Sequence, residues 1–138
     1  MDIKELFIQF HYPELKNLLL NILTLSYSIF TFSVVFAEKF IEKENKKNRG
    51  RISLFSAWIF FICSLIIGGI ALVRLVIAGD FAHGGQIISR GNFYWGHINS
   101  IEQHLIDVYS FSFVAGVCFV TALSLLAVSA FYKLFKKK

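Results

Sequence analysis

The amino-acid sequence predicts an all-α membrane protein in which three transmembrane helices form a single domain. Hydrophobic residues make up 56% of the 138-residue chain and charged residues 17%, whereas a soluble globular domain has about 45–50% and about 25%. Sixteen phenylalanines would give a soluble domain of this size more apolar surface than its core can bury. Most of this apolar content lies in three long runs that carry no charge.

The three spans are expected at about residues 15–38, 53–78 and 106–132 of one integral-membrane domain. Their uncharged cores are residues 18–37, 54–73 and 108–132. About 20 residues at 1.5 Å each cross a hydrocarbon core of roughly 30 Å. Because lipid offers the backbone no hydrogen-bond partners, each span must be a helix.

A short helix that lies in the membrane interface is expected before the first span. Asp2 and Glu5 have the spacing of a helix N-terminal capping box. Pro13 suits the first turn of the first span, where its missing N–H costs nothing. The apolar side chains that fall on one face of the N-terminal helix are Ile3, Leu6, Phe7 and Phe10.

The two connections between the spans differ in composition. Residues 38–47 (EKFIEKENKK) contain good helix formers and no breaker, so the first helix should continue beyond the membrane. A turn at residues 48–50 would complete a helical hairpin with a charged cytoplasmic tip. Residues 79–99 hold five glycines and the aromatic run FYW, which predicts an irregular extracytoplasmic loop at the interface. Ser100 and Gln103 have capping-box spacing, so the third helix should begin there and reach Phe135.

Lysine and arginine predict the orientation of the chain. Basic residues gather between the first two spans and after the third, and the positive-inside rule places both flanks in the cytoplasm. The N-terminus and the loop that follows the second span would then lie outside, in a multi-pass protein of the plasma (inner) membrane. The net charge of +5 is mainly this orientation signal. It predicts anionic lipid at the cytoplasmic face as a partner, and not nucleic acid.

The first span carries a polar stripe at helical spacing. Polar side chains gain nothing by facing lipid, so such a stripe either forms hydrogen bonds between helices or lines a wet path. The members of the stripe are Asn21, Thr24, Ser28 and Thr31.

The second span carries a stripe of small residues. Small side chains let helix backbones approach closely, either within the three-helix unit or against another chain. The third span offers two similar pairs, Ser112 with Gly116 and Cys118 with Ala122. The members of the second-span stripe are Ala57, Ser64, Gly68 and Ala71.

Arg74 is the one charge embedded in an otherwise apolar run. A charge within a span is a functional-site hypothesis, although Arg74 can also reach the headgroups or pair with Asp80 or Asp107. His83, His97 and His104 fall on the predicted outer side near carboxylates, so they are weak candidates for metal binding or pH sensing. Their spacing matches no tight metal motif. Cys63 and Cys118 lie inside spans, as small packing residues do.

The sequence holds no catalytic motif and predicts no cofactor, so we expect a non-enzymatic protein that acts by helix–helix assembly. It would be a homo-oligomer or an accessory subunit of a larger membrane complex. One alternative is an oligomeric pore or membrane-disrupting effector lined by the first-span polar stripe. The spans resemble those of many small bacterial membrane proteins, and the topology is similar to that of class I phage holins, which lack the long hairpin and outer loop predicted here. The other alternative is an extracytoplasmic metal or pH sensor that uses the histidines.

Overall fold

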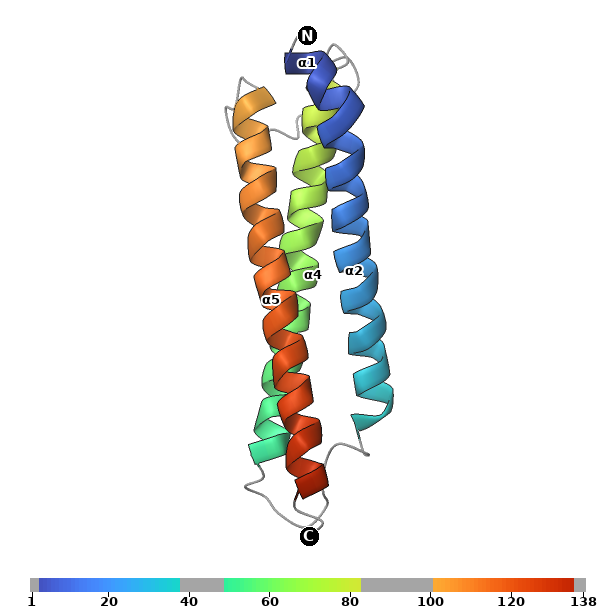
Figure 1. Cartoon of the computed structure of the whole chain (residues 1–138), viewed down its shortest axis with the longest axis vertical. Helices are drawn as coiled ribbons and strands as arrows, with labels where there is room; N and C mark the ends of the chain where they lie inside the picture. The colour runs from blue at the N-terminus through green and yellow to red at the C-terminus, as the bar shows by residue number, and fades with distance from the viewer. Residues whose placement is uncertain (1–2, 38–48, 83–100, 136–138) are drawn as a thin grey trace.

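The computed structural model describes residues 3–37, 49–82 and 101–135, which form three long helices and a short N-terminal helical segment (Figure 1). The N-terminal segment consists of α1 (Ile3–Leu6) and η1 (Phe7–His11). The long helices are α2 (Tyr12–Val35), α4 (Arg49–Ala82) and α5 (Ile101–Phe135). These described residues contain no strand, so this part of the chain is all-helical as predicted.

Three helical stretches are long and apolar enough to cross a membrane, and each overlaps one predicted span. They are Phe7–Val35, Gly50–Asp80 and Gln103–Tyr132. The prediction of a multi-pass membrane protein with three spans is confirmed at this level. Figure 1 shows that the three helices run alongside one another, with the C-terminal end of α2, the start of α4 and the end of α5 at one end of the bundle.

The helix ends agree only in part with the sequence-based predictions. α5 covers Ile101–Phe135, in agreement with the predicted range, and the predicted cap residue Ser100 lies outside the described residues. The predicted turn at residues 48–50 is wrong for its last two residues, because α4 already begins at Arg49. Packing against α5 explains this difference. Gly50 is buried at the contact between α4 and α5, and its carbonyl accepts a hydrogen bond from Ser129 of α5. The loop predicted at residues 79–99 is wrong for its first four residues, because α4 continues to Ala82. A helix there keeps its backbone hydrogen bonds within the chain, which an irregular segment next to lipid would lose. The rest of this loop and the predicted hairpin before Arg49 lie outside the described residues.

The N-terminal segment runs directly into α2. η1 is one wide π-helical turn, closed by the Tyr12 N–H, which donates to the Phe7 carbonyl. Pro13 lies in the first turn of α2, as predicted. Its ring would crowd the carbonyl four residues earlier, and the wider turn relieves this contact. Phe7 is buried, whereas Leu6 and Phe10 are exposed, so the predicted apolar face is not buried as a unit. The interfacial position of this segment stays a prediction.

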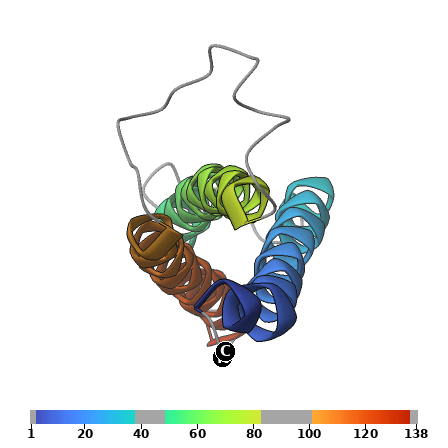
Figure 2. The same ribbon diagram turned by 90° about the horizontal axis from the view of Figure 1, so that it is seen from above.

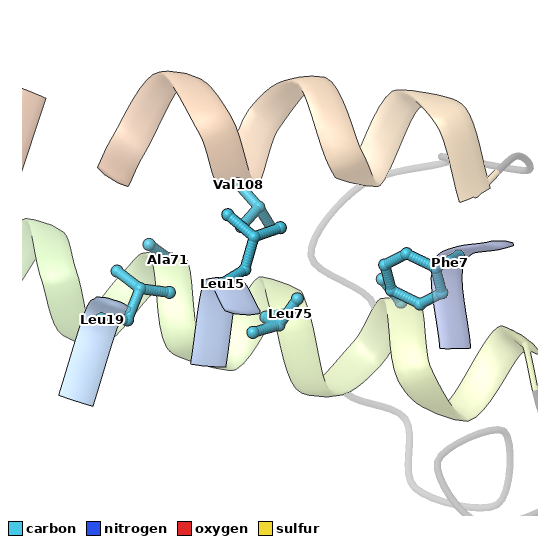
Figure 3. Close-up of a cluster of buried hydrophobic side chains, with 7 residues drawn as sticks. Phe7, Leu15, Leu19, Ala71, Leu75 and Val108 are labelled. Carbon is cyan, nitrogen blue, oxygen red and sulfur yellow. The ribbon is translucent and has the colours of Figure 1, made fainter. Parts of the chain in front are cut away.

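The three long helices occupy the corners of a triangle when the bundle is seen end on (Figure 2). α4 packs along its length against α5 and more sparsely against α2, while α2 and α5 touch at few points. Large apolar side chains on the outer faces are exposed, as lipid-facing side chains must be. The main apolar cluster joins η1, α2, α4 and α5 (Figure 3) and consists of Phe7, Leu15, Leu19, Ala71, Leu75, Ala78 and Val108.

The interior of the bundle follows a seven-residue repeat. A spacing of seven keeps a seam of side chains against the neighbouring helix, as in coiled coils. The seam of α4 is made of small residues, which allow the close approach that membrane helices need. Its buried members are Gly50, Ala57, Ser64, Ala71 and Ala78. The matching seam of α5 consists of the buried residues Val108, Ala115, Ala122 and Ser129.

Candidate functional site

The predicted stripe of α4 lies at the centre of the bundle. Ala57, Ser64, Gly68 and Ala71 are all buried. A Cβ added at Gly68 would lie 3.1 Å from Leu23 Cδ2 of α2 and 3.8 Å from Ala115 Cβ of α5. This stripe is therefore occupied by contacts within the three-helix unit.

Serine hydroxyls connect all three helices at this level. The Ser64 hydroxyl donates to the Ala115 carbonyl of α5 at 2.9 Å. Ser64 Oγ also lies 3.3 Å from Ser26 Oγ of α2. Because the one proton of Ser64 is already directed at the carbonyl, Ser26 is the donor in this second bond.

Two further sites of hydrogen bonding fix the end of the bundle where α4 begins. Ser53 of α4 donates to the Leu125 carbonyl of α5 at 2.7 Å, and Ser129 of α5 donates back to the Gly50 carbonyl at 2.9 Å. On the α2 side, Trp58 Nε1 donates to Ser33 Oγ at 2.9 Å, and Ser33 donates to the carbonyl of its own helix at Phe30. Among the buried serines that the structure describes, all but Ser112, which donates within α5, thus form hydrogen bonds across helices.

The predicted polar stripe of α2 lies on the opposite side of that helix. The inward face of α2 is formed by Leu15, Leu19, Ser26 and Ser33, which are buried. At about 100° per residue, the predicted stripe points away from this face. Its four residues, Asn21, Thr24, Ser28 and Thr31, are all exposed on the surface of the bundle.

Asn17 extends this exposed stripe by one turn toward the N-terminus. It is exposed and lies four residues before Asn21, so the two amides share a face. We call Asn17, Asn21, Thr24, Ser28 and Thr31 the α2 polar stripe. Within the described residues, none of these five side chains makes a hydrogen bond. The hydroxyls of α5 behave differently, since Thr121 and Ser124 donate to carbonyls four residues earlier in their own helix.

Sequence reasoning identified Ser64 as a member of the second-span stripe, but it did not identify Asn17 or the other side chains that bond between helices. A signal was present for three of these. Ser26 and Ser33 follow Leu19 at steps of seven residues, and Ser129 follows Ala122 at the same step. Ser53 and Trp58 give no such signal in isolation, because their partners belong to other helices.

Arg74 is paired across α4 and α5. Its Nη1 atom lies 4.0 Å from Oδ2 of Asp107, one of the two partners that the sequence suggested. The Arg74 side chain is 15% exposed and that of Asp107 is 34% exposed. Because Nη1 has no hydrogen bond and the oxygen is at the limit of ion-pair distance, the pair is loose. It holds a largely buried cation at the end of the bundle near the N-terminus.

The structure describes one of the three candidate metal residues. His104 is buried at 3% exposure on α5, whereas His83 and His97 lie outside the described residues. The described ranges contain no group of three or more histidine, cysteine, aspartate or glutamate side chains that could hold a metal ion. His11 instead contacts Tyr109, whose hydroxyl lies 3.0 Å from its Nδ1 atom. Cys63 and Cys118 are free thiols, both partly buried.

Comparison of the chain with protein-family models, with curated proteins and with solved structures found no match. The candidate site therefore rests on the geometry of the bundle alone. The α2 polar stripe is the feature that this geometry leaves without a partner.

Proposed function

We propose that this protein acts by helix–helix assembly in the membrane, and that the α2 polar stripe is its contact surface. It would work as a homo-oligomer or as an accessory subunit of a larger membrane complex. The single observation that carries the proposal is the exposure of five polar side chains on the side of α2 that faces away from the bundle.

The energetics of polar groups in lipid support this contact surface. Side-chain amides and hydroxyls on the lipid face of a span have no hydrogen-bond partner in lipid. Each hydrogen bond that they form with another helix stabilises the assembly by about 0.6 kcal/mol. The hydroxyls of Thr24, Ser28 and Thr31 and the two amides thus offer several such bonds to a second helix. The α4 stripe, which the sequence offered as a second contact surface, is already filled by Leu23 and Ala115.

The proposed orientation keeps the charged ends of the bundle in the cytoplasm. Basic residues gather in the sequence next to the C-terminal end of α2, the start of α4 and the end of α5, which lie at one end of the bundle. The positive-inside rule then assigns that end to the cytoplasmic side of the plasma membrane, where anionic lipid attracts it.

Site-directed photocrosslinking tests this contact surface. A photoreactive amino acid in place of Ser28 should give a crosslinked product in native membranes, because that position faces the partner helix. The matched control is the same substitution at Ser124, which is exposed at a comparable place on α5 and whose hydroxyl is already bonded to Val120. Equal yields at the two positions, or no product at Ser28, would refute the proposed surface.

A pore is the second candidate function, and the length of the stripe favours it. Asn17 to Thr31 covers about 21 Å along a helix, which is most of a hydrocarbon core of roughly 30 Å. A ring of copies with these stripes turned inward would therefore line a polar path. Conductance of reconstituted protein distinguishes the candidates, since assembly without a pore leaves a bilayer sealed. The metal or pH sensor stays a prediction that depends on His83 and His97.

A further inference from the structure

An apolar groove runs between α2 and α5 on the half of the bundle nearer the N-terminus. Its volume is about 650 Å³, within the roughly 300–1,000 Å³ of small-ligand pockets. Leu15 and Ile22 of α2 form one wall, and α5 contributes residues from Tyr109 to Thr121. The groove lies between two helices that touch at few points. It faces a different side of α2 from the polar stripe, so it is independent of the proposed assembly surface.

We propose that this groove binds one acyl chain of a phospholipid from the leaflet on the N-terminal side of the bundle. The length of the groove agrees with this occupant. From Tyr109 to Thr121, α5 rises about 18 Å, close to the thickness of one leaflet, which is about half of a 30 Å hydrocarbon core. The groove thus begins near one interface and ends near the middle of the membrane.

Below its mouth, the lining of the groove suits hydrocarbon. The hydroxyls of Ser112 and Thr121 are already used, since Ser112 donates to the Val108 carbonyl and Thr121 donates to the Val117 carbonyl. The third hydroxyl of the lining belongs to Tyr109 and lies at the mouth. At Gly116 the groove is open, because a Cβ added there would meet no atom within 4 Å. A chain of methylene groups can lie along this floor without leaving a polar group unsatisfied.

A hydrocarbon chain can enter this groove directly from the surrounding bilayer. It is thinner than a helix, which is about 10 Å wide with its side chains. A second copy of the chain is the competing occupant, and the protein stoichiometry in the experiment below distinguishes the two.

The mouth of the groove is bridged by two side chains that suit a headgroup region. The Tyr109 hydroxyl lies 3.0 Å from His11 Nδ1, and the two rings meet edge to face. Tyrosine is a common residue at the membrane interface, where its ring is apolar and its hydroxyl is wet. Because this bridge supplies hydrogen bonds and not a fixed charge, the groove should select a lipid by its chain and accept different headgroups.

Native mass spectrometry of the full chain tests the proposal. The protein is delipidated in detergent and then titrated with dioleoyl phosphatidylcholine or dioleoyl phosphatidylglycerol. We expect one bound lipid for each chain with either headgroup. Gly116→Phe fills the floor of the groove and should weaken binding about tenfold, the effect of losing contact with about two methylene groups. The matched control is Val114→Phe, an exposed position of α5 that does not line the groove, and it should bind like wild type.

A second variant, Val120→Trp, fills the groove from another position and keeps the test valid if Gly116→Phe fails to fold. Circular dichroism checks that each variant keeps its helix content. Four results would overturn the proposal. The first three are wild-type protein that binds no lipid, equal binding by wild type and both filling variants, and a loss in Val114→Phe as large as in Gly116→Phe. The fourth is a change in protein stoichiometry with unchanged lipid binding, which would assign the groove to another chain.

Discussion

Ser26 of α2 and Ser64 of α4 face each other inside the bundle, with their Oγ atoms 3.3 Å apart. Since Ser64 also donates to the Ala115 carbonyl of α5, one pair of hydroxyls joins all three helices. Both serines are fully buried. In a membrane the hydrophobic effect does not hold helices together, so packing and hydrogen bonds of this kind set their positions.

Replacement of Ser64 with alanine should loosen this junction. The change removes both hydrogen bonds of the hydroxyl, and at about 0.6 kcal/mol for each bond the free energy of unfolding should fall by about 1 kcal/mol. Unfolding in mixed micelles with increasing dodecyl sulfate measures this change. Ser124→Ala is the control, because its hydroxyl bonds only within α5 and is exposed. Equal stability of the two variants would contradict the role of Ser64.

The adjacent glycines Gly68 and Gly69 should respond differently to the same substitution. Gly68→Leu pushes a large side chain against Leu23 and should lower the free energy of unfolding by about 1–3 kcal/mol. Gly69→Leu adds the side chain where a Cβ meets no atom within 4 Å, so stability should be unchanged or slightly higher. Thermal denaturation of the two variants side by side measures the difference. If Gly69→Leu were the more damaging change, the rotation of α4 described here would be wrong.

Arg74 and Asp107 should depend on each other energetically. Loss of either partner leaves the other charge partly buried, so Arg74→Met and Asp107→Leu should each destabilise the bundle more than their combination does. A double-mutant cycle should give a coupling energy of about 1 kcal/mol, because the pair is loose and Asp107 is partly exposed. Strictly additive effects would show that Arg74 is stabilised by its surroundings and not by Asp107.

The sequence was sufficient to predict the spans and the length of the third helix. Uncharged runs of this length form helices in lipid, and the described α5 covers the range that the sequence predicted for the third helix. It also offered Asp107 as a partner for Arg74, because both were expected near the same end of the bundle. These predictions depend on the composition and spacing of residues within single segments, which can be seen without knowing how the helices pack.

The rotation of α2 could not be predicted in the same way. Two sets of polar residues lie on opposite faces of this helix. The steps of seven from Leu19 to Ser26 favour the set that turns inward, but polarity alone gives the set that contains Ser28 the same weight. Ser26 turns inward because Ser64 of α4 is there to accept its proton. The partners that fix this rotation belong to other helices. Gly68 of α4 lets the helices approach closely, and the Ala115 carbonyl of α5 accepts a hydrogen bond from Ser64. The sequence of α2 by itself carries no information about either contact.

The mass of the protein in its native lipid tests most directly the claim that the α2 polar stripe is an assembly surface. Wild type and the double variant Asn21→Leu with Ser28→Leu would be extracted from membranes in polymer nanodiscs and weighed by mass photometry or native mass spectrometry. We predict that wild type exceeds the 15.8 kDa of one chain and that the double variant returns to that mass, while Ser124→Leu behaves as wild type. A wild-type monomer with no partner, or an assembly that survives the double substitution, would contradict the account.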